Sequence, residues 1–328
     1  MSTGGPILQV EGLRTWFHLG SGLLKAVDDV TFDVEAGRTL CIVGESGSGK
    51  SVTALSVMRL IDPPGRIEAG RVLYGDRNLL TLSETELETT IRGNRIGMVF
   101  QDPMTSVNPV FTIGDQIAEG LIAHRGLTRA QARNQAIDLL KLVGIPDASD
   151  HYRSYPHEFS GGMCQRVMIA AAIACEPDIL IADEPTTALD VTIQAQILRL
   201  LMELKERLHS ALVLITHDLG VVAATADRVV VMYAGRIVEQ ADVDSIFGAP
   251  RHPYTVGLLD SVIRLDERRD AALRAIPGAP PVPLNLPAGC SFRPRCPHAF
   301  AACHRVPELS MVGAGHRAAC HLVGSAGA

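Results

Sequence analysis

The sequence predicts an α/β fold built on an open sheet, with functional residues at the carboxyl ends of its strands. Three observations lead to this prediction. A short apolar run at residues 39–43 is followed by a glycine-rich turn and a predicted helix over residues 51–60. A second apolar run, residues 179–182, ends in two carboxylates. From residue 178 to residue 238 predicted strands and helices alternate, which is typical of α/β proteins.

Length and composition favour a large globular protein of about two domains. The chain has 328 residues, 47% of them hydrophobic, and a formal net charge of −6. This balance indicates no nucleic-acid partner, because such proteins usually carry a basic domain or patch. No apolar run approaches the roughly 20 residues that span a bilayer. Because the amino-terminal segment has no basic residue before Arg14 and no apolar core, it does not resemble a signal peptide, and we expect a cytosolic chain.

The most specific motif is the glycine-rich turn after the first strand, here called the phosphate loop (residues 44–51). It fits G-x-x-x-x-G-K-[ST] at every fixed position. Its residues are Gly44, Glu45, Ser46, Gly47, Ser48, Gly49, Lys50 and Ser51. A strand, such a turn and a helix N-terminus form an anion cradle of backbone N–H groups. We expect Lys50 to reach the β and γ phosphates of a nucleotide, and the Ser51 hydroxyl to bind Mg²⁺.

The second apolar strand carries the acidic pair that such a site needs. Asp183 and Glu184 follow residues 179–182 directly. Because ligands of open α/β sheets bind at the carboxyl ends of strands, we expect Asp183 to assist Mg²⁺. Glu184 is placed to polarise a water molecule for attack on the γ phosphate.

From here the sequence resembles the ATPase subunits of ABC transporters. Residues 159–166, Phe-Ser-Gly-Gly-Met-Cys-Gln-Arg, resemble the signature motif of that family. Gln101 resembles the Q-loop glutamine, which the resemblance places at the nucleotide and Mg²⁺. Asp190, in the Ala-Leu-Asp of residues 188–190, resembles the D-loop, and His217 resembles the switch histidine that senses the γ phosphate. The resemblance implies an ABC ATPase core of the phosphate-loop class with an inserted helical subdomain.

Two more features of that family concern the base and the partner subunit. Phe17, or its neighbour Trp16, resembles the aromatic residue that stacks on adenine. The Ser160 hydroxyl, with the amides of Gly161 and Gly162 at a helix N-terminus, forms a second anion site. In the family this site contacts ATP held by the opposite subunit, so ATP binds between two ATPase chains. Leu and Gln usually flank Ser-Gly-Gly in this motif. The Phe and Met found here leave the anion-binding residues intact.

Predicted helices dominate residues 113–175, and Thr128 is a candidate N-cap for a helix over residues 128–143. Another helix is predicted over residues 192–208. We therefore predict a nucleotide-binding domain at residues 1–247 with a helical subdomain at about residues 103–176. Residues 248–328 are a predicted C-terminal extension, which begins with a helix and continues through a proline-rich linker at residues 276–287.

The extension narrows the resemblance to importers of dipeptides, oligopeptides, nickel and glutathione. The His-Pro-Tyr element at residues 252–254 and the Cys-Ser-Phe-Arg-Pro-Arg-Cys-Pro stretch at residues 290–297 carry this likeness. It implies a peripheral ATPase on the cytoplasmic face of the inner membrane, which powers an importer whose expected cargo is peptides. The implied partners are a second ATPase chain, favoured as a paralogue, two transmembrane permease subunits and a solute-binding protein. The open alternatives are nickel or glutathione as cargo, a soluble ABC ATPase of repair or translation, and a regulatory module.

The extension also holds four of the seven cysteines, within what is here called the cysteine block (residues 290–320). They are Cys290, Cys296, Cys303 and Cys320. In a cytosolic chain, ligation of a metal or cluster by these cysteines is favoured over disulfide bonds. Structural zinc sites usually contain C-x₂₋₄-C pairs, and this spacing has none. Four thiolates suit a [4Fe–4S] cluster, with zinc or an empty site as alternatives. Cys41, Cys164 and Cys175 are expected to be small buried apolar residues.

Overall fold

The computed structural model describes residues 5–187, 189–261, 276–281 and 284–323. The chain divides into two compact units. The phosphate-loop unit comprises residues 6–34, 39–80 and 216–328, and the helical unit comprises residues 1–5, 35–38 and 81–215. Ala188 of the predicted D-loop and the end of the helix predicted after residue 251 lie outside the described residues.

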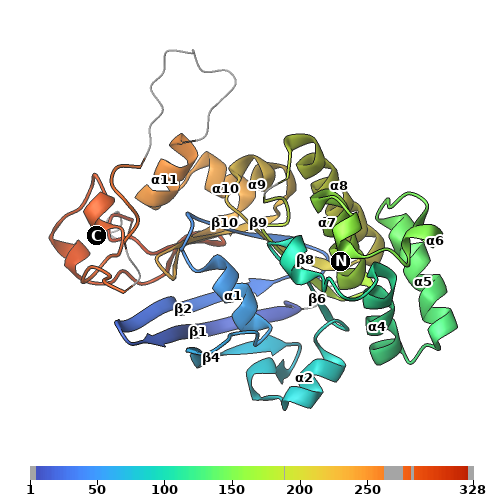
Figure 1. Cartoon of the computed structure of the whole chain (residues 1–328). Helices are drawn as coiled ribbons and strands as arrows, with labels where there is room; N and C mark the ends of the chain where they lie inside the picture. Colours follow the sequence, from blue (N-terminus) through green and yellow to red (C-terminus); the bar gives the residue numbers. More distant parts are fainter. Residues whose placement is uncertain (1–4, 188, 262–275, 282–283, 324–328) are drawn as a thin grey trace. The chain divides into compact units, whose positions relative to one another are not determined.

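An antiparallel sheet begins the phosphate-loop unit. Its strands are β1 (Leu8–Leu19), β2 (Gly22–Val34), β4 (Gly65–Tyr74) and β5 (Arg77–Asn78), in the order β2-β1-β4-β5. Figure 1 shows β1, β2 and β4 side by side. Alternate residues of β1 are buried, among them Leu8 and Val10, as expected for a strand with one face on a core.

A second set of strands in this unit contains β3 (Thr39–Val43), which is parallel to β9 (Arg228–Tyr233). The antiparallel strands β10 (Arg236–Asp242), β12 (His316–Ala318) and β11 (Ser310–Gly313) follow β9 in that order. Its α-helices are α1 (Lys50–Val57), α9 (Leu219–Thr225), α10 (Val243–Gly248) and α11 (Pro253–Asp260). The cysteine block therefore ends as two strands added to the edge of β10.

The helical unit contains parallel strands β6 (Ile96–Val99), β7 (Ile179–Asp183) and β8 (Ala211–Thr216), whose last residue already belongs to the other unit. Its α-helices are α2 (Glu84–Thr90), α3 (Pro103–Ser106), α4 (Ile113–Arg125), α5 (Arg129–Leu142), α6 (Ala148–His151), α7 (Gly161–Ile173) and α8 (Val191–Leu208). In Figure 1, α4 and α5 lie side by side in green, and both pack on α7.

The apolar runs form the buried strands that the sequence predicts. All five residues of β3 and all five of β7 are buried. Thr128 caps α5, and Gln131 completes a capping box, so that helix also begins where predicted. The described residues of the proline-rich linker form neither helix nor strand. Within the described part of the chain, no helix is long and apolar enough to cross a bilayer.

Candidate functional site

The phosphate loop connects the end of β3 to the start of α1, and its backbone requires glycine at two close approaches. Gly44 has φ +152°, and a Cβ there would lie 2.2 Å from the Met232 carbonyl oxygen. Gly49 has φ +100°, and a Cβ there would lie 2.3 Å from the Ala26 carbonyl oxygen. L-residues rarely adopt these conformations, and neither gap admits a methyl group. The loop is therefore packed directly against neighbouring backbone.

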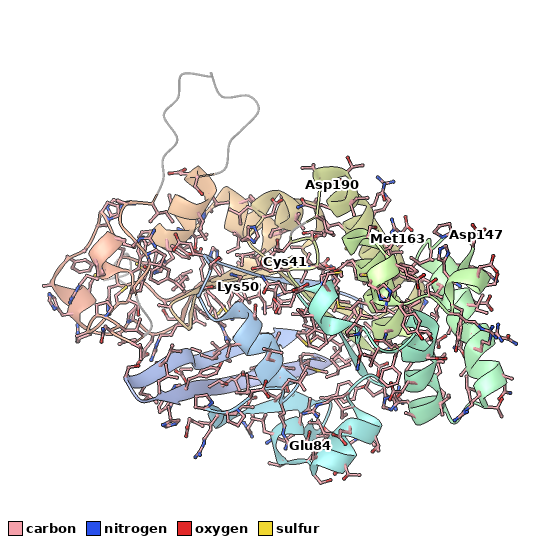
Figure 2. The ribbon with its side chains drawn as sticks, viewed as in Figure 1. Cys41, Lys50, Glu84, Asp147, Met163 and Asp190 are labelled. Carbon is pink, nitrogen blue, oxygen red and sulfur yellow. The ribbon has the colours of Figure 1, made fainter. Side chains whose placement is uncertain are left out.

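Lys50 is the first residue of α1, where Figure 2 labels it, and it is only 4% exposed. Its Nζ donates hydrogen bonds to the carbonyl oxygens of Gly44, at 2.8 Å, and Glu45, at 3.1 Å. The Ser48 hydroxyl is buried beside Gly44 and has no hydrogen-bond partner among the described residues. A buried ammonium group and an unsatisfied buried hydroxyl on one loop fit an anionic oxygen-rich ligand such as a nucleotide phosphate.

Glu184 follows β7 in the helical unit with the left-handed φ of +44°, which is uncommon for a residue with a side chain. Its backbone N–H donates to the Ile215 carbonyl oxygen at 2.9 Å. Its Oε2 accepts hydrogen bonds from Gln101 Nε2, at 3.3 Å, and from Thr187 Oγ1, at 2.9 Å. The structure thus joins two predicted residues and adds Thr187, which the sequence motifs did not reveal. Asp183, the last residue of β7, is 5% exposed.

The signature residues begin α7 as predicted. The Oγ of Ser160 accepts a hydrogen bond from the Met163 N–H at 3.4 Å, and both Gly161 and Gly162 lie in the first turn. A Cβ on Gly162 would lie 2.9 Å from Ile193 Cγ2 on α8, so α7 and α8 are in close contact there. Asp190 caps α8 by accepting from the Ile193 N–H at 3.0 Å. Figure 2 labels Met163 and Asp190 at these two helix starts.

Three further predicted residues, Phe17, Trp16 and His217, lie in the phosphate-loop unit. Phe17 on β1 is half-buried, and its ring covers Gly65 so closely that a Cβ there would lie 2.6 Å from Cε1. Trp16 holds the Lys25 ammonium group 4.7 Å above its ring. His217 is exposed directly after β8. The residues of the phosphate loop and Phe17 therefore belong to one unit, and Gln101, Ser160, Asp183, Glu184 and Asp190 to the other.

Of the four cysteines of the block, Cys303 is buried and the other three are partly buried. The Cys290 N–H donates to the Cys303 carbonyl oxygen at 3.0 Å. Burial raises the pKa of the Cys290, Cys296 and Cys320 thiols, and the other cysteines of the block raise each of these pKa values further. In the part of the chain that is described, no three His, Cys, Asp or Glu side chains are grouped so that they could hold a metal ion. The arrangement therefore does not support the predicted [4Fe–4S] or zinc site.

The remaining cysteines are buried, as the sequence predicts. Cys41 on β3 is fully buried, and burial raises the pKa of its thiol to about 12. Burial also raises the pKa of the Cys164 and Cys175 thiols. Protonated buried thiols behave as small apolar side chains.

The strand–loop–helix unit around Lys50 places the chain among the proteins that bind nucleotide phosphates with a phosphate loop. Residues 27–187 match the ABC transporter family, and residues 238–303 match the oligopeptide/dipeptide transporter C-terminal region. The oligopeptide transport ATP-binding protein OppD of Salmonella typhimurium is 50% identical over 314 residues, which cover 96% of this chain and 93% of that protein. The oligopeptide transport ATP-binding protein AppD of Bacillus subtilis is 49% identical, with 98% of each chain covered.

A solved structure supports the fold. The dimeric structure of a bacterial ABC transporter cassette is 28% identical, with a TM-score of 0.64, and covers 72% of this chain and 98% of its own. The chain belongs to the ABC transporter family of ATP-binding proteins and is an ABC-type ATPase. ATP with Mg²⁺ is the nucleotide expected for this family.

Proposed function

We propose that the chain is the ATP-hydrolysing subunit of an importer that takes up dipeptides or oligopeptides. The observation that carries this proposal is likeness over nearly the whole length to oligopeptide transport ATP-binding proteins, including the C-terminal region. The ABC ATPase motifs would suit any ABC transporter, whereas residues 238–303 match the oligopeptide/dipeptide transporter C-terminal region. Nickel or glutathione import by the same machinery is the alternative that the cargo test below distinguishes.

Each predicted residue has a role in this proposal. Lys50 and the backbone amides of the phosphate loop bind the nucleotide phosphates, and Phe17 stacks on adenine. Ser51, Gln101 and Asp183 are the proposed Mg²⁺ ligands, and Mg²⁺ would neutralise phosphate charge. Glu184 orients the attacking water, and its contacts with Gln101 and Thr187 fix the direction of its carboxylate.

The remaining motif residues act between subunits. Ser160, Gly161 and Gly162 lie at the start of α7, where a hydroxyl and helix-start amides suit the γ phosphate of ATP held by a second ATPase chain. Asp190 would lie in the same dimer contact, and His217 would sense the γ phosphate. The other partners are two permease subunits and a solute-binding protein, so the chain would be peripheral at the cytoplasmic face of the inner membrane. The second ATPase chain is proposed to be a paralogue.

The proposed domains remain residues 1–247 for the nucleotide-binding domain, with its helical subdomain at about residues 103–176, and residues 248–328 for the extension. For the cysteine block a [4Fe–4S] cluster stays a proposal that rests only on the four cysteines in its sequence, because the described side chains are not grouped to hold a metal. Iron and acid-labile sulfide analysis of anaerobically purified protein tests it. Zinc without sulfide, or neither metal, would each disprove the cluster.

Replacement of Glu184 tests the ATPase mechanism. Glu184→Gln should lower ATP turnover by a factor of about 10² to 10⁴, because water activation is lost. Nucleotide affinity should persist, because phosphate binding does not need this carboxylate. Glu203→Gln, which changes an exposed glutamate on α8, is the matched control and should turn over ATP like the wild type. Full turnover in Glu184→Gln would refute the role of Glu184.

Affinity purification of the tagged chain from membranes tests the transport function. Co-purification of permease subunits and a solute-binding protein is expected, and the ligand preference of that binding protein identifies the cargo. A binding protein that prefers nickel or glutathione would transfer the proposal to those substrates. Recovery of ribosomes or DNA without a permease would refute a role in import.

A further inference from the structure

Arg295 extends from the cysteine block into the interior of the phosphate-loop unit. It ends the short 3₁₀ turn Arg293–Arg295, immediately before Cys296, yet its side chain is only 5% exposed. Its Nη1 donates to Glu45 Oε2 at 2.6 Å, and its Nη2 donates to Glu45 Oε1 at 3.0 Å. Both atoms of the Glu45 carboxylate are therefore bound by one guanidinium group. This two-pronged geometry is the strong form of an Arg–carboxylate pair.

The rest of the guanidinium group is also held. Its Nε donates to the Pro277 carbonyl oxygen at 3.0 Å, and Nη2 reaches the Ile276 carbonyl oxygen at 3.4 Å. Nη1 also lies 3.4 Å from the Tyr233 hydroxyl. These partners come from the proline-rich linker and from β9, so the position of Arg295 is fixed independently of Glu45. A fixed cation can position the group that it binds, whereas a mobile surface charge cannot.

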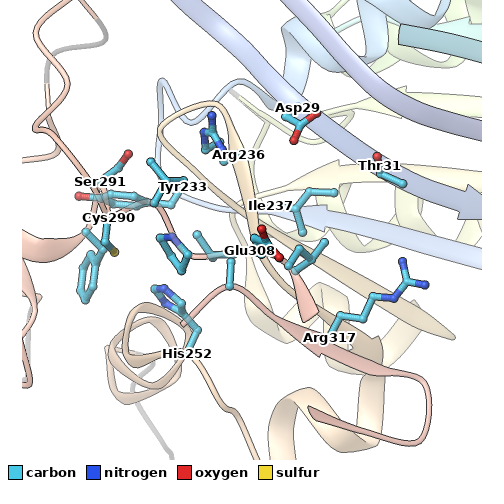
Figure 3. A pocket seen from close by; sticks show the side chains of 17 residues that line it. Asp29, Thr31, Tyr233, Arg236, Ile237, His252, Cys290, Ser291, Glu308 and Arg317 are labelled. Carbon is cyan, nitrogen blue, oxygen red and sulfur yellow. The ribbon is translucent and has the colours of Figure 1, made fainter. Parts of the chain in front are cut away.

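A second contact reaches the same residue of the phosphate loop. The Glu45 N–H donates to the Tyr254 hydroxyl at 2.8 Å, and Tyr254 on α11 is fully buried. The Tyr254 ring lies 4.6 Å from the Tyr233 ring and 5.4 Å from the Phe292 ring of the cysteine block. Tyr233 and His252 also line a pocket of about 550 Å³, in which Figure 3 shows Tyr233 beside Cys290. Residues of the C-terminal extension thus bind both the side chain and the backbone of Glu45.

Glu45 in turn affects the phosphate-binding part of the loop in two ways. Its carbonyl oxygen and that of Gly44 accept hydrogen bonds from Lys50, so rotation of the 44–45 peptide would move the lysine ammonium group. Its carboxylate is a negative charge on a loop that must bind negative phosphates. Only 26% of that side chain is exposed, so water screens it poorly. An unpaired Glu45 would therefore repel the ligand.

We propose that Arg295 is a positioning residue for the nucleotide: it neutralises Glu45 and, with Tyr254, holds the first turn of the phosphate loop in the conformation that binds ATP. The C-terminal extension is then part of the nucleotide site as well as a transporter-specific appendage. This inference rests on the proposed ATP binding by the phosphate loop.

The test measures Mg-ATP affinity of the full-length chain by titration with a fluorescent ATP analogue. Arg295→Met should bind about tenfold more weakly, a typical size for coupling between neighbouring sites. Arg295→Lys keeps the charge and should recover part of the affinity. Arg293→Met is the matched control, because Arg293 lies two residues away on the same turn and contacts His304. That control should bind like the wild type.

Removal of the Glu45 carboxylate distinguishes a positioning role of Arg295 from a general loss of structure in its variants. Glu45→Gln/Arg295→Met should bind more tightly than Arg295→Met, because no uncompensated negative charge remains. Glu45→Gln alone should also bind more tightly than Arg295→Met, because its remaining charge is positive. If Arg295→Met fails to fold, Arg295→Lys, which is also expected to bind more weakly than the wild type, takes its place in these comparisons. Equal affinity of wild type and Arg295→Met, or Glu45→Gln as weak as Arg295→Met, overturns the inference. A wild type that binds no ATP refutes the proposed function itself.

Discussion

Acidification should destabilise the phosphate-loop unit through His252, which is 1% exposed at the start of α11. Its Nδ1 accepts a hydrogen bond from the Tyr254 N–H at 3.0 Å, which requires the neutral imidazole. Burial lowers the pKa of His252 from 6.5 to about 4. Two other titratable residues are linked to this position: Glu239, which accepts a hydrogen bond from the His252 backbone N–H at 2.9 Å, and His316, which hydrogen-bonds Glu239.

The sign follows from the two protonation equilibria. Between pH 6.5 and about pH 4 the unfolded chain binds a proton at this histidine and the folded chain does not. The contribution of the neutral imidazole is therefore complete above pH 6.5 and is lost progressively as the pH falls toward 4. One pH unit is worth about 1.4 kcal/mol, so moving from pH 7 to pH 5 should lower the free energy of unfolding by about 2 kcal/mol.

Urea unfolding followed by tryptophan fluorescence measures this loss. The chain has one tryptophan, Trp16, and it lies in the same unit as His252. His252→Asn is the reference variant, because asparagine can also accept the N-cap hydrogen bond but does not titrate. The wild type should lose about 2 kcal/mol more than this variant between pH 7 and pH 5. Identical pH dependence of the two proteins would refute the buried neutral histidine.

Three other outcomes are expected. Gly44→Ala would place a methyl group 2.2 Å from the Met232 carbonyl oxygen, so it should lower the free energy of unfolding in urea by about 3 kcal/mol. A loss below about 1 kcal/mol would contradict the tight packing of the loop. Thr187→Ala removes a hydrogen bond to Glu184 and should lower the kcat for ATP about tenfold with unchanged nucleotide affinity; unchanged kcat would show that Thr187 does not orient Glu184. Because the pKa of Cys41 is raised to about 12, iodoacetamide at pH 8 should alkylate it about a thousand times more slowly in the folded than in the unfolded chain. Mass spectrometry measures both rates, and equal rates would contradict the burial of Cys41.

Local chemistry made much of the fold and of the site predictable from the sequence. The apolar runs at β3 and β7 can be buried only as strands, and the Thr128–Gln131 pair identifies the start of α5. The glycines of the phosphate loop are required by backbone conformations that few other residues adopt. In each case the residues that determine the structure are close together in the sequence.

Contacts between distant segments could not be predicted in this way. Arg295 and Glu45 are separated by 250 positions, and nothing in the spacing of either motif indicates the other. The His-Pro-Tyr element at residues 252–254 carries a family likeness, but its pattern does not reveal that the Tyr254 hydroxyl binds the loop backbone. The sequence does not indicate the polar α2, because only Leu87 of its seven residues is buried, which leaves no helical apolar period.

The buried carboxylate of Glu239 explains why these distant segments act together. Its Oε1 accepts from the Arg251 N–H at 2.6 Å and from His316 Nε2 at 2.7 Å, and Glu239 is fully buried. A buried carboxylate is stable only when such donors satisfy it, so β10, β12 and the start of α11 must form together. Tyr254 on α11 accepts a hydrogen bond from the Glu45 N–H. Strand β12, near the end of the cysteine block, pairs with β10 and therefore also helps to fix the position of the first residues of the phosphate loop.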